Sequence, residues 1–257
     1  MTAPQNTKGR LFLVPTPLDF GCAEQAPISD VLPLATLAAA ACLRHWVCEN
    51  AKTTRAFLKR VGESHPLIAP LAEQQITELP RHVHKKGDHQ SGFDAKPLLA
   101  AALQGHDIGL ISEAGMPAVA DPGSSVVRAA HDLGMTVVPL VGPVSLLLAL
   151  AASGLNGQNF AFVGYLPQDA SERGARLKQL ESLAFKTGQT QLWIETPYRN
   201  AAMLNGLLQS LQGNTRLAIA SGLTLPSARI QSHSVAQWKK GLQGPDGHTP
   251  AVYAIGP

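Results

Sequence analysis

Short apolar segments alternate with longer helix-forming segments along most of this chain of 257 residues. Residues 108–112 and 137–140 are almost wholly apolar, which is typical of strands that are buried on both faces of a sheet. Parallel neighbours in a sheet need a crossover connection, and the helix-forming segments supply it. The alternation therefore predicts an α/β fold with a mostly parallel sheet in the first half of the chain. We expect strands there at residues 10–14, 45–48, 75–79, 108–112 and 135–140, and helices at 30–43, 50–61, 94–104 and 121–133.

Gly142 and Pro143 interrupt this pattern and mark a candidate domain boundary. Beyond them we expect helices at 144–153, 171–185 and 199–212, and strands at 159–164, 190–195 and 215–220. The chain then ends with two strands, 228–232 and 251–255, around a short helix at 234–240, which fits a mixed or antiparallel sheet. We therefore predict two α/β domains, residues 1–141 and 142–257, the second with a mixed sheet.

The composition indicates a folded globular protein, because 45% of the residues are hydrophobic and 15% are charged. The net charge of +3 is too small to argue for a nucleic-acid partner by itself. The three cysteines form no C-x-x-C pair, and their odd number argues against a disulfide framework. Reduced thiols fit the cytosol, and residues 1–10 lack the apolar core of a signal peptide, so we expect a cytoplasmic protein.

No residue between Leu133 and Gln168 is charged, and residues 137–155 approach the length of a membrane span. A proline and a Gly-Pro pair cut this run near its start. What remains, residues 144–155, has the length of a buried helix. We therefore expect no association with a membrane.

Three common α/β motifs are absent: the G-x-G-x-x-G dinucleotide fingerprint, the P-loop and the G-x-S-x-G nucleophile elbow. Residues 112–123 instead read Ser-Glu-Ala-Gly-Met-Pro-Ala-Val-Ala-Asp-Pro-Gly, between an expected buried strand and a helix. Ligands of open α/β sheets bind just beyond the carboxyl ends of the strands, and small residues let the backbone approach them. A connection that merely needs its turns would have the same residues, so both interpretations stay open. The candidate binding residues are Ser112, Glu113, Ala114, Gly115 and Asp121, and Asp121 is also the expected cap of the next helix.

Two further loops are expected at the same edge of the sheet. Thr16 and Pro17 follow the first strand, and Gly142, Pro143 and Val144 follow the strand at 135–140. Parallel strands end at one edge, so three small loops there predict a cleft more strongly than one loop does.

Glu195 ends another expected strand and precedes Thr-Pro-Tyr-Arg. A carboxylate there can hold a hydroxyl group or accept a proton. The alternative is a helix start, with Thr196 as the cap and Pro197 at the first helical position.

Two basic segments favour structural interpretations. Lys52, Arg55 and Lys59 share one helical face, which is more typical of a solvated surface than of a phosphate track. Residues 81–89 read Arg-His-Val-His-Lys-Lys-Gly-Asp-His, and an exposed loop is favoured over an anion or RNA contact. The histidine spacing is compatible with zinc, but no cysteine or fourth ligand is near, so we expect no metal site. Cys48 has no evident base partner and is expected to be a small core residue.

Together these motifs resemble the tetrapyrrole methylase superfamily, and within it the bacterial small-subunit ribosomal RNA ribose 2′-O-methyltransferases. The resemblance covers nearly the whole chain in the same order. Residues 112–123 are similar to the S-D-A-G-T-P-x-x-S-D-P-G loop of that branch, and residues 139–155 to its P-x-P-G-P-x-A run. Four further segments are similar to motifs of the branch. Residues 13–18 resemble V-x-T-P-I, and residues 49–50 with the next helix resemble E-D-T-R. Residues 164–167 resemble G-F-L-P, and residues 195–199 resemble E-S-P-H-R.

The resemblance implies two α/β domains with S-adenosylmethionine bound in the cleft between them, and usually a homodimer. It adds Gly164 and Tyr165 to the candidate cofactor-binding residues. It also explains the missing glycine fingerprint, which this branch lacks. Methyl transfer from a sulfonium needs no metal, but a ribose hydroxyl is a poor nucleophile and benefits from a base. The candidate carboxylates for that role are Glu195, Glu113 and Glu49.

The sequence departs from the branch at several charged positions. Asn50, Glu113 and Met116 stand where the branch has Asp, Asp and Thr, and its R-E-L-T-K motif is Ser-Gly-Leu-Thr-Leu at 221–225. Loss of the Arg, Glu and Lys of that motif weakens the case for phosphate contacts. We interpret the chain as a divergent paralogue, with methylation of a ribosomal RNA ribose or a related substrate as the leading hypothesis. The alternatives are a methyltransferase for a small molecule such as a tetrapyrrole, and an S-adenosylmethionine-binding protein without catalytic activity.

Overall fold

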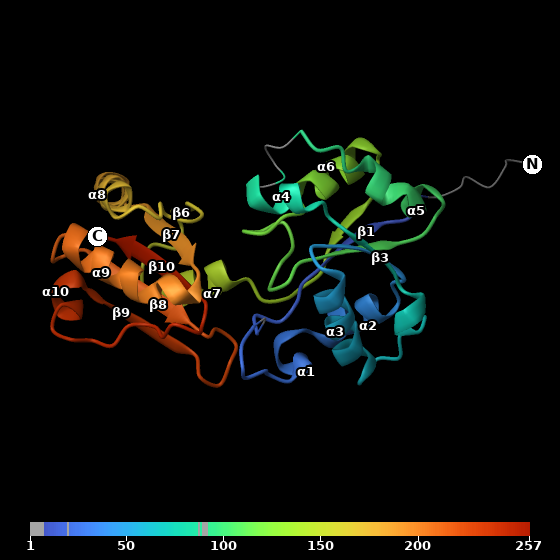
Figure 1. Cartoon of the computed structure of the whole chain (residues 1–257), viewed down its shortest axis with the longest axis horizontal. Coiled ribbons are helices and arrows are strands. Elements are labelled where there is room, and N and C mark those ends of the chain that lie inside the picture. The colour runs from blue at the N-terminus through green and yellow to red at the C-terminus, as the bar shows by residue number, and fades with distance from the viewer. Residues whose placement is uncertain (1–7, 20, 87, 89–91) are drawn as a thin grey trace, which may run out of the picture. The chain divides into compact units, whose positions relative to one another are not determined.

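The computed structural model describes residues 8–19, 21–86, 88 and 92–257, and it divides into two compact units (Figure 1). The first unit ends at Val144, and the second runs from Ser145 to Pro257 with Gly21–Gln25 added. The division comes a few residues after the expected boundary at 141. The sequence did not indicate that Gly21–Gln25 belongs with the second unit, where Ser227 Oγ donates to Glu24 Oε2 at 2.8 Å.

The first unit contains a parallel sheet, as the alternation predicted. Its strands are β1 (Leu11–Val14), β2 (His45–Cys48), β3 (Gln75–Glu78), β4 (Ile108–Ile111) and β5 (Val137–Pro139). They form a five-stranded sheet in the order β3-β2-β4-β1-β5, with every neighbouring pair parallel. This order puts β4 and β1 in the middle, so the loops that follow them start at the centre of the carboxyl edge.

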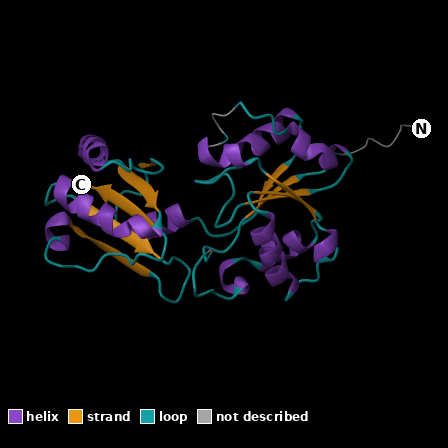
Figure 2. Cartoon of the chain, viewed as in Figure 1, coloured by secondary structure: helices purple, strands orange, loops and turns teal. Residues whose placement is uncertain are grey.

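Helices cover both faces of this sheet, as Figure 2 shows. The helical segments of the unit are α1 (Ile28–Val31), α2 (Leu34–Ala41), α3 (Ala51–Gly62), η1 (Leu71–Glu73), α4 (Arg81–Lys86), η2 (Lys96–Leu99), α5 (Ala100–Leu103) and α6 (Ser124–Asp132). Trp46 and Phe12 pack with α2 and α3 on one face. Leu11 and Leu110 pack with η2, α5 and α6 on the other. Burial on both faces explains why these strands are apolar throughout.

The second unit contains a mixed sheet, again as predicted. Its strands are β6 (Phe160–Phe162), β7 (Thr190–Glu195), β8 (Arg216–Ser221), β9 (Arg229–Ser234) and β10 (Ala251–Gly256), in the order β6-β7-β10-β8-β9. Only β6 and β7 pair in parallel among these strands; the other neighbours are antiparallel. Its helices are α7 (Ser145–Ser153), α8 (Ala170–Thr187), η3 (Pro197–Arg199), α9 (Asn200–Ser210) and α10 (Val235–Trp238). Trp193 and Tyr253 lie in the core with α8 and α9, whereas α7 contacts β8, β9 and β10 outside that core.

The helix expected at 94–104 is the 3-10 segment η2 followed by the four-residue helix α5. Two other expected helices differ from the structure for local reasons. The helix expected at 30–43 is divided into α1 and α2, because Pro33 stands at the N-cap of α2 and cannot continue a helix from α1. The helix expected at 121–133 begins only at Ser124, so Asp121 as its cap was wrong. Gly123, at the true N-cap, has a φ of +136° that favours glycine.

The apolar run at 137–155 contains the short strand β5 and the nine-residue helix α7. Across the described part of the chain, no helix is both long and apolar enough to span a bilayer.

Candidate functional site

Three loops meet at the carboxyl edge of the first unit's sheet, as their positions after parallel strands predicted. Thr16 N donates to Gly115 O at 2.9 Å, and Gly115 N donates to Thr16 O at 3.1 Å. Gly142 lies so close to the first loop that a Cβ on it would be 2.3 Å from Pro15 Cγ. Gly115 has a φ of +77° and lies next to Pro143 O. The loops that follow β1, β4 and β5 therefore form one packed assembly.

Several residues expected to bind a ligand also hold these loops together. Both backbone polar groups of Gly115 are used by Thr16. The Thr16 hydroxyl donates to Ser112 O at 3.4 Å, and Ser112 Oγ donates to Gly115 O at 3.3 Å. Thr16 and Ser112 are buried, as are Pro17 and Pro143. The expected binding residues that keep partial exposure in this unit are Glu113, Ala114, Asp121, Gly142 and Val144.

A carboxylate cluster, formed by Glu49, Glu113 and Asp121, lies at the same edge. Glu49 directly follows β2, and Glu113 follows the neighbouring strand β4. Burial, then the negative charges of Asp121 and Glu113, raise the pKa of Glu49 to about 8. Burial also raises the pKa of Asp121 to about 6, with Glu113 adding to the shift and a hydrogen bond from Ser112 opposing it.

The cluster has few compensating contacts. The Thr53 hydroxyl donates to Glu113 Oε1 at 3.4 Å, and the Glu113 N–H donates to the Glu49 carboxylate. Glu49 Oε1 is buried without a hydrogen-bond partner among the described residues. No ion pair within the described chain includes any of the three carboxylates. Three carboxyl groups are thus gathered at this edge without a cation from the described residues beside them, which is the arrangement expected where a ligand brings positive charge.

Asp88 is a site residue that sequence reasoning missed. It is 3% exposed, and its Oδ2 accepts from Gly123 N at 2.9 Å and from Ser125 N at 2.7 Å. The hydroxyls of Ser124 and Ser125 also donate to it, each at 2.7 Å. Burial alone would raise the pKa of Asp88, but these hydrogen bonds outweigh burial and lower it. Asp88 therefore caps α6, and the signal available was that Gly123 has no side chain to cap the helix itself.

The second unit holds Gly164, Tyr165 and Glu195, the other expected site residues. Gly164 and Tyr165 follow β6, and Gly164 O accepts from Ile194 N at 3.2 Å, next to Glu195 at the end of β7. Gly164 has a φ of +77°, and the Tyr165 side chain is 59% exposed.

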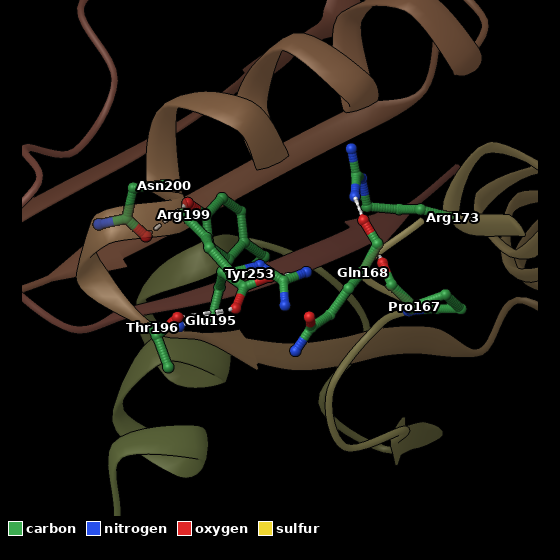
Figure 3. Close-up of polar contacts among 8 residues, drawn as sticks. All are labelled: Pro167, Gln168, Arg173, Glu195, Thr196, Arg199, Asn200 and Tyr253. Carbon is green, nitrogen blue, oxygen red and sulfur yellow. Dashed lines mark hydrogen bonds and ion pairs between the residues drawn. The ribbon is translucent and has the colours of Figure 1, made fainter. Parts of the chain in front are cut away.

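The Glu195 carboxylate is occupied by neighbours (Figure 3). Glu195 is 3% exposed, its Oε1 accepts from Thr196 N at 2.8 Å, and its Oε2 lies 3.1 Å from Arg199 Nη2. Thr196 and Pro197 stand at the N-cap and first position of η3, which confirms the helix-start interpretation. A buried, ion-paired carboxylate of this kind is better explained by structure than by proton transfer.

The remaining candidates are surface or core residues. Lys52, Arg55 and Lys59 are exposed on α3, in agreement with a solvated face. Cys48 is buried, and burial raises the pKa of its thiol, which fits a core residue. Residues 81–89 were expected to form an exposed loop, but residues 81–86 form the helix α4. Residues 87 and 89 lie outside the described residues. The side chains of residues 84–86 are likewise not described, so the zinc interpretation of this segment falls outside the described residues.

The departures from the branch pattern have local structural roles. Asn50 caps α3, since its side chain accepts from Lys52 N at 2.9 Å, as an aspartate would. Ser221 ends β8 and the chain then turns through Gly222 and Thr224, both at positive φ. Leu225, where the branch has lysine, is 6% exposed.

Sequence relatives agree on one family. The pattern of the family described as Tetrapyrrole (Corrin/Porphyrin) Methylases matches residues 32–237. A "Ribosomal RNA small subunit methyltransferase I" from Mesorhizobium japonicum is 36% identical over 217 residues, 83% of this chain and 63% of that protein. The protein of the same name from Escherichia coli O157:H7 is 30% identical over 219 residues, 85% of this chain and 67% of that protein. This chain thus spans slightly less than two thirds of the length of the first relative.

Solved structures of similar fold are more distant in sequence. The methyltransferase CobJ has a TM-score of 0.55 at 17% identity, over 96% of this chain and 94% of its own. The native form of uroporphyrin III C-methyl transferase from Thermus thermophilus has a TM-score of 0.51 at 18% identity, over 96% and 97%. At these identities the likeness establishes the fold alone. The match over both units, with relatives at 30–36% identity, shows that the chain belongs to the tetrapyrrole (corrin/porphyrin) methylase family, in the branch of the small-subunit ribosomal RNA methyltransferases I.

Proposed function

We propose that this protein is an S-adenosylmethionine-dependent methyltransferase whose leading substrate class is a ribose 2′-hydroxyl of ribosomal RNA. The observation that carries the proposal is the carboxylate cluster of Glu49, Glu113 and Asp121, built on the motif loops and without a cation from the described chain. The relatives named for small-subunit ribosomal RNA support the substrate class.

The residues at the cluster fit this cofactor in charge and size. When bound, S-adenosylmethionine supplies a methyl group on a positively charged sulfur that is already a good leaving group. Carboxylates stabilise a nearby positive charge, most strongly where burial lowers the local dielectric. Ala114 is small and partly exposed beside Glu113, which leaves room for a ligand next to the backbone. Gly164 and Tyr165 in the second unit stay in the proposal as further cofactor contacts.

Glu49 is the best candidate for the proton acceptor. A ribose hydroxyl is a poor nucleophile, and a carboxyl group with a pKa of about 8 accepts its proton far better than an ordinary carboxylate does. Glu113 and Asp121 keep that pKa high by their negative charge. Glu195 is less suited, because Arg199 and Thr196 already hold its oxygens.

Calorimetric titration of the purified chain with S-adenosylmethionine and S-adenosylhomocysteine tests this assignment. At pH 8.5, where Glu49 is ionised, we expect Glu49→Gln to weaken the sulfonium ligand about tenfold and the neutral thioether less than about threefold. Glu63→Gln, on the exposed end of α3, is the matched control and should change neither affinity. Failure of the wild-type protein to bind either ligand at millimolar concentration would contradict the proposal.

Substrate and turnover need a second assay. Small-subunit RNA incubated with protein and methyl-labelled cofactor should yield labelled 2′-O-methyl nucleosides after digestion. The rate should rise with pH towards about 8, as Glu49 loses its proton, and the Glu49→Gln variant should lose this rise. Label on a tetrapyrrole precursor instead of RNA would favour a small-molecule substrate, which the net charge of +3 and the buried Leu225 keep open. Binding without turnover on either substrate would favour the non-catalytic alternative.

We also propose a cytoplasmic homodimer. Leu147 and Leu148 on α7 are 50% and 39% exposed, and Phe160 and Phe162 on β6 are 42% and 36% exposed. These apolar side chains come from the run without charged residues, which is typical of a surface covered by a partner. Light scattering should give a dimer mass for the wild type and a monomer mass for Leu147→Lys with unchanged circular dichroism. A wild-type monomer at micromolar concentration would contradict the dimer.

A further inference from the structure

Two arginines of the second unit, Arg173 and Arg199, have different partners (Figure 3). Arg199 is paired with the Glu195 carboxylate at 3.1 Å. Arg173, on α8, is 9% exposed, and no carboxylate pairs with it among the described residues. Its Nε is also buried without a hydrogen-bond partner there. Because burying a charged group without a counter-ion is unfavourable, the position of Arg173 needs an explanation.

Arg173 holds the end of the loop that follows β6. Its Nη1 donates to Gln168 O at 2.8 Å and to Pro167 O at 3.3 Å (Figure 3). Other contacts also hold the loop, residues 164–168. Gly164 O accepts from Ile194 N at 3.2 Å at its start, and the side chain of Leu166, 3% exposed, lies in the core. Tyr165, between these two residues, is 59% exposed.

Helix α9 is adapted to the guanidinium of Arg173. Gly206 lies in the middle of α9, where glycine is less favourable than alanine. A Cβ at Gly206 would be 3.2 Å from Arg173 Nε and 3.8 Å from Nη2. The glycine therefore gives the Arg173 side chain room against α9.

We infer that Arg173 is a positioning residue that fixes the loop at residues 164–168 for ligand binding. It touches no ligand itself and acts through the carbonyls of Pro167 and Gln168, which set the place of Gly164 and Tyr165. The inference rests on the proposed function, because that proposal assigns these two residues to the cofactor. Without the guanidinium the loop keeps its apolar anchor at Leu166 but loses the attachment at its end.

Hydrogen exchange and ligand binding together test the role of Arg173. In Arg173→Met we expect the amide of Tyr165 to exchange about tenfold faster, while core amides of β7 keep their rates. The Kd of S-adenosylhomocysteine and the KM of S-adenosylmethionine should rise about tenfold, with kcat at saturation within about threefold of wild type. Arg173→Lys should restore most of both losses, because an ammonium also donates to carbonyls. Arg176→Met, on the exposed side of the same helix, is the control and should match the wild type.

Gly206→Ala keeps the test decisive if Arg173→Met folds poorly. Alanine raises helix propensity, so a purely structural view expects equal or higher stability. The added Cβ, 3.2 Å from Arg173 Nε, would require the Arg173 side chain to shift by a few tenths of an ångström, so we expect faster exchange in the loop and weaker ligand binding without loss of the fold. Wild-type exchange rates in both variants would overturn the inference. Faster exchange in the loop with an unchanged Kd for S-adenosylhomocysteine would also overturn it. If the wild-type protein binds no cofactor, the proposed function fails, and the exchange rates still decide whether Arg173 holds the loop.

Discussion

Glu49 and Glu195 each mark the carboxyl end of a strand, yet their surroundings are opposite. Glu195 ends β7 with Arg199 on one oxygen and Thr196 on the other. Glu49 follows β2 among other acids, and no cation of the described residues forms an ion pair with it. The same residue type at the same kind of position thus gives a structural ion pair in one unit and a poised carboxyl group in the other. What decides the role is the charge that the fold brings beside each carboxylate.

Removing the charge of Glu195 should have the largest effect on stability. Glu195→Gln leaves the Arg199 guanidinium, 16% exposed, without its counter-ion, which costs about 3–4 kcal/mol for a buried pair. Urea unfolding at pH 7 measures this loss as a lower midpoint with an unchanged slope. The double variant Glu195→Gln with Arg199→Met should recover part of it, because no unpaired charge then remains. If Glu195→Gln keeps wild-type stability but loses all methyl transfer, Glu195 would be the functional carboxylate and not a structural one.

Much of the local structure around the two glutamates could be predicted from the sequence, but only at short range. Apolar runs located the strands, a helix was expected to begin at Asn50, which caps α3, and Thr196 with Pro197 indicated a helix start. The meeting of the three loops followed from parallel pairing, which sends every strand end to one edge. In each case the physics lies within a few residues or follows from sheet topology.

The parts that sequence reasoning did not predict depend on contacts between distant residues. Asp88 caps a helix that starts far along the chain, whereas the sequence placed it in a basic loop and assigned the cap to Asp121. Gly115 was expected to offer its backbone to a ligand, but Thr16 uses both of its polar groups. Whether a carboxylate meets arginine or other acids also depends on packing between elements that the sequence does not reveal.

The surroundings of Asp88 are intermediate between those of Glu195 and Glu49. Its carboxylate is buried and accepts several hydrogen bonds. Asp88→Asn should lower the free energy of unfolding by about 2 kcal/mol at pH 7, since it weakens the contacts to Gly123 and Ser125. The folded pKa of Asp88 is lowered, so its contribution is present above the unfolded pKa and is lost as the pH falls through the folded one. Unfolding curves at pH 7 and pH 3 should therefore show a smaller difference between variant and wild type at pH 3. An equal difference at both values would mean that the charge of Asp88 contributes nothing to the cap.

Glu49 should give the smallest effect on stability and the one of opposite sign. Its folded pKa is raised to about 8, so its stabilising contribution is complete below the unfolded pKa and is lost as the pH rises through 8. The free energy of unfolding of the wild type should therefore fall between pH 5 and pH 9. Because Gln cannot ionise, the fall should be smaller in Glu49→Gln, by about 1–2 kcal/mol after allowance for solvent screening. Thermal unfolding across this range measures the difference, with Glu63→Gln as the control that follows the wild type. Asp88→Asn should slightly reduce the loss of unfolding free energy between pH 5 and pH 9, because the charge of Asp88 contributes to the raised pKa of Glu49. Parallel curves for wild type and Glu49→Gln would mean that a cation compensates Glu49, and the two strand-end glutamates would then no longer differ.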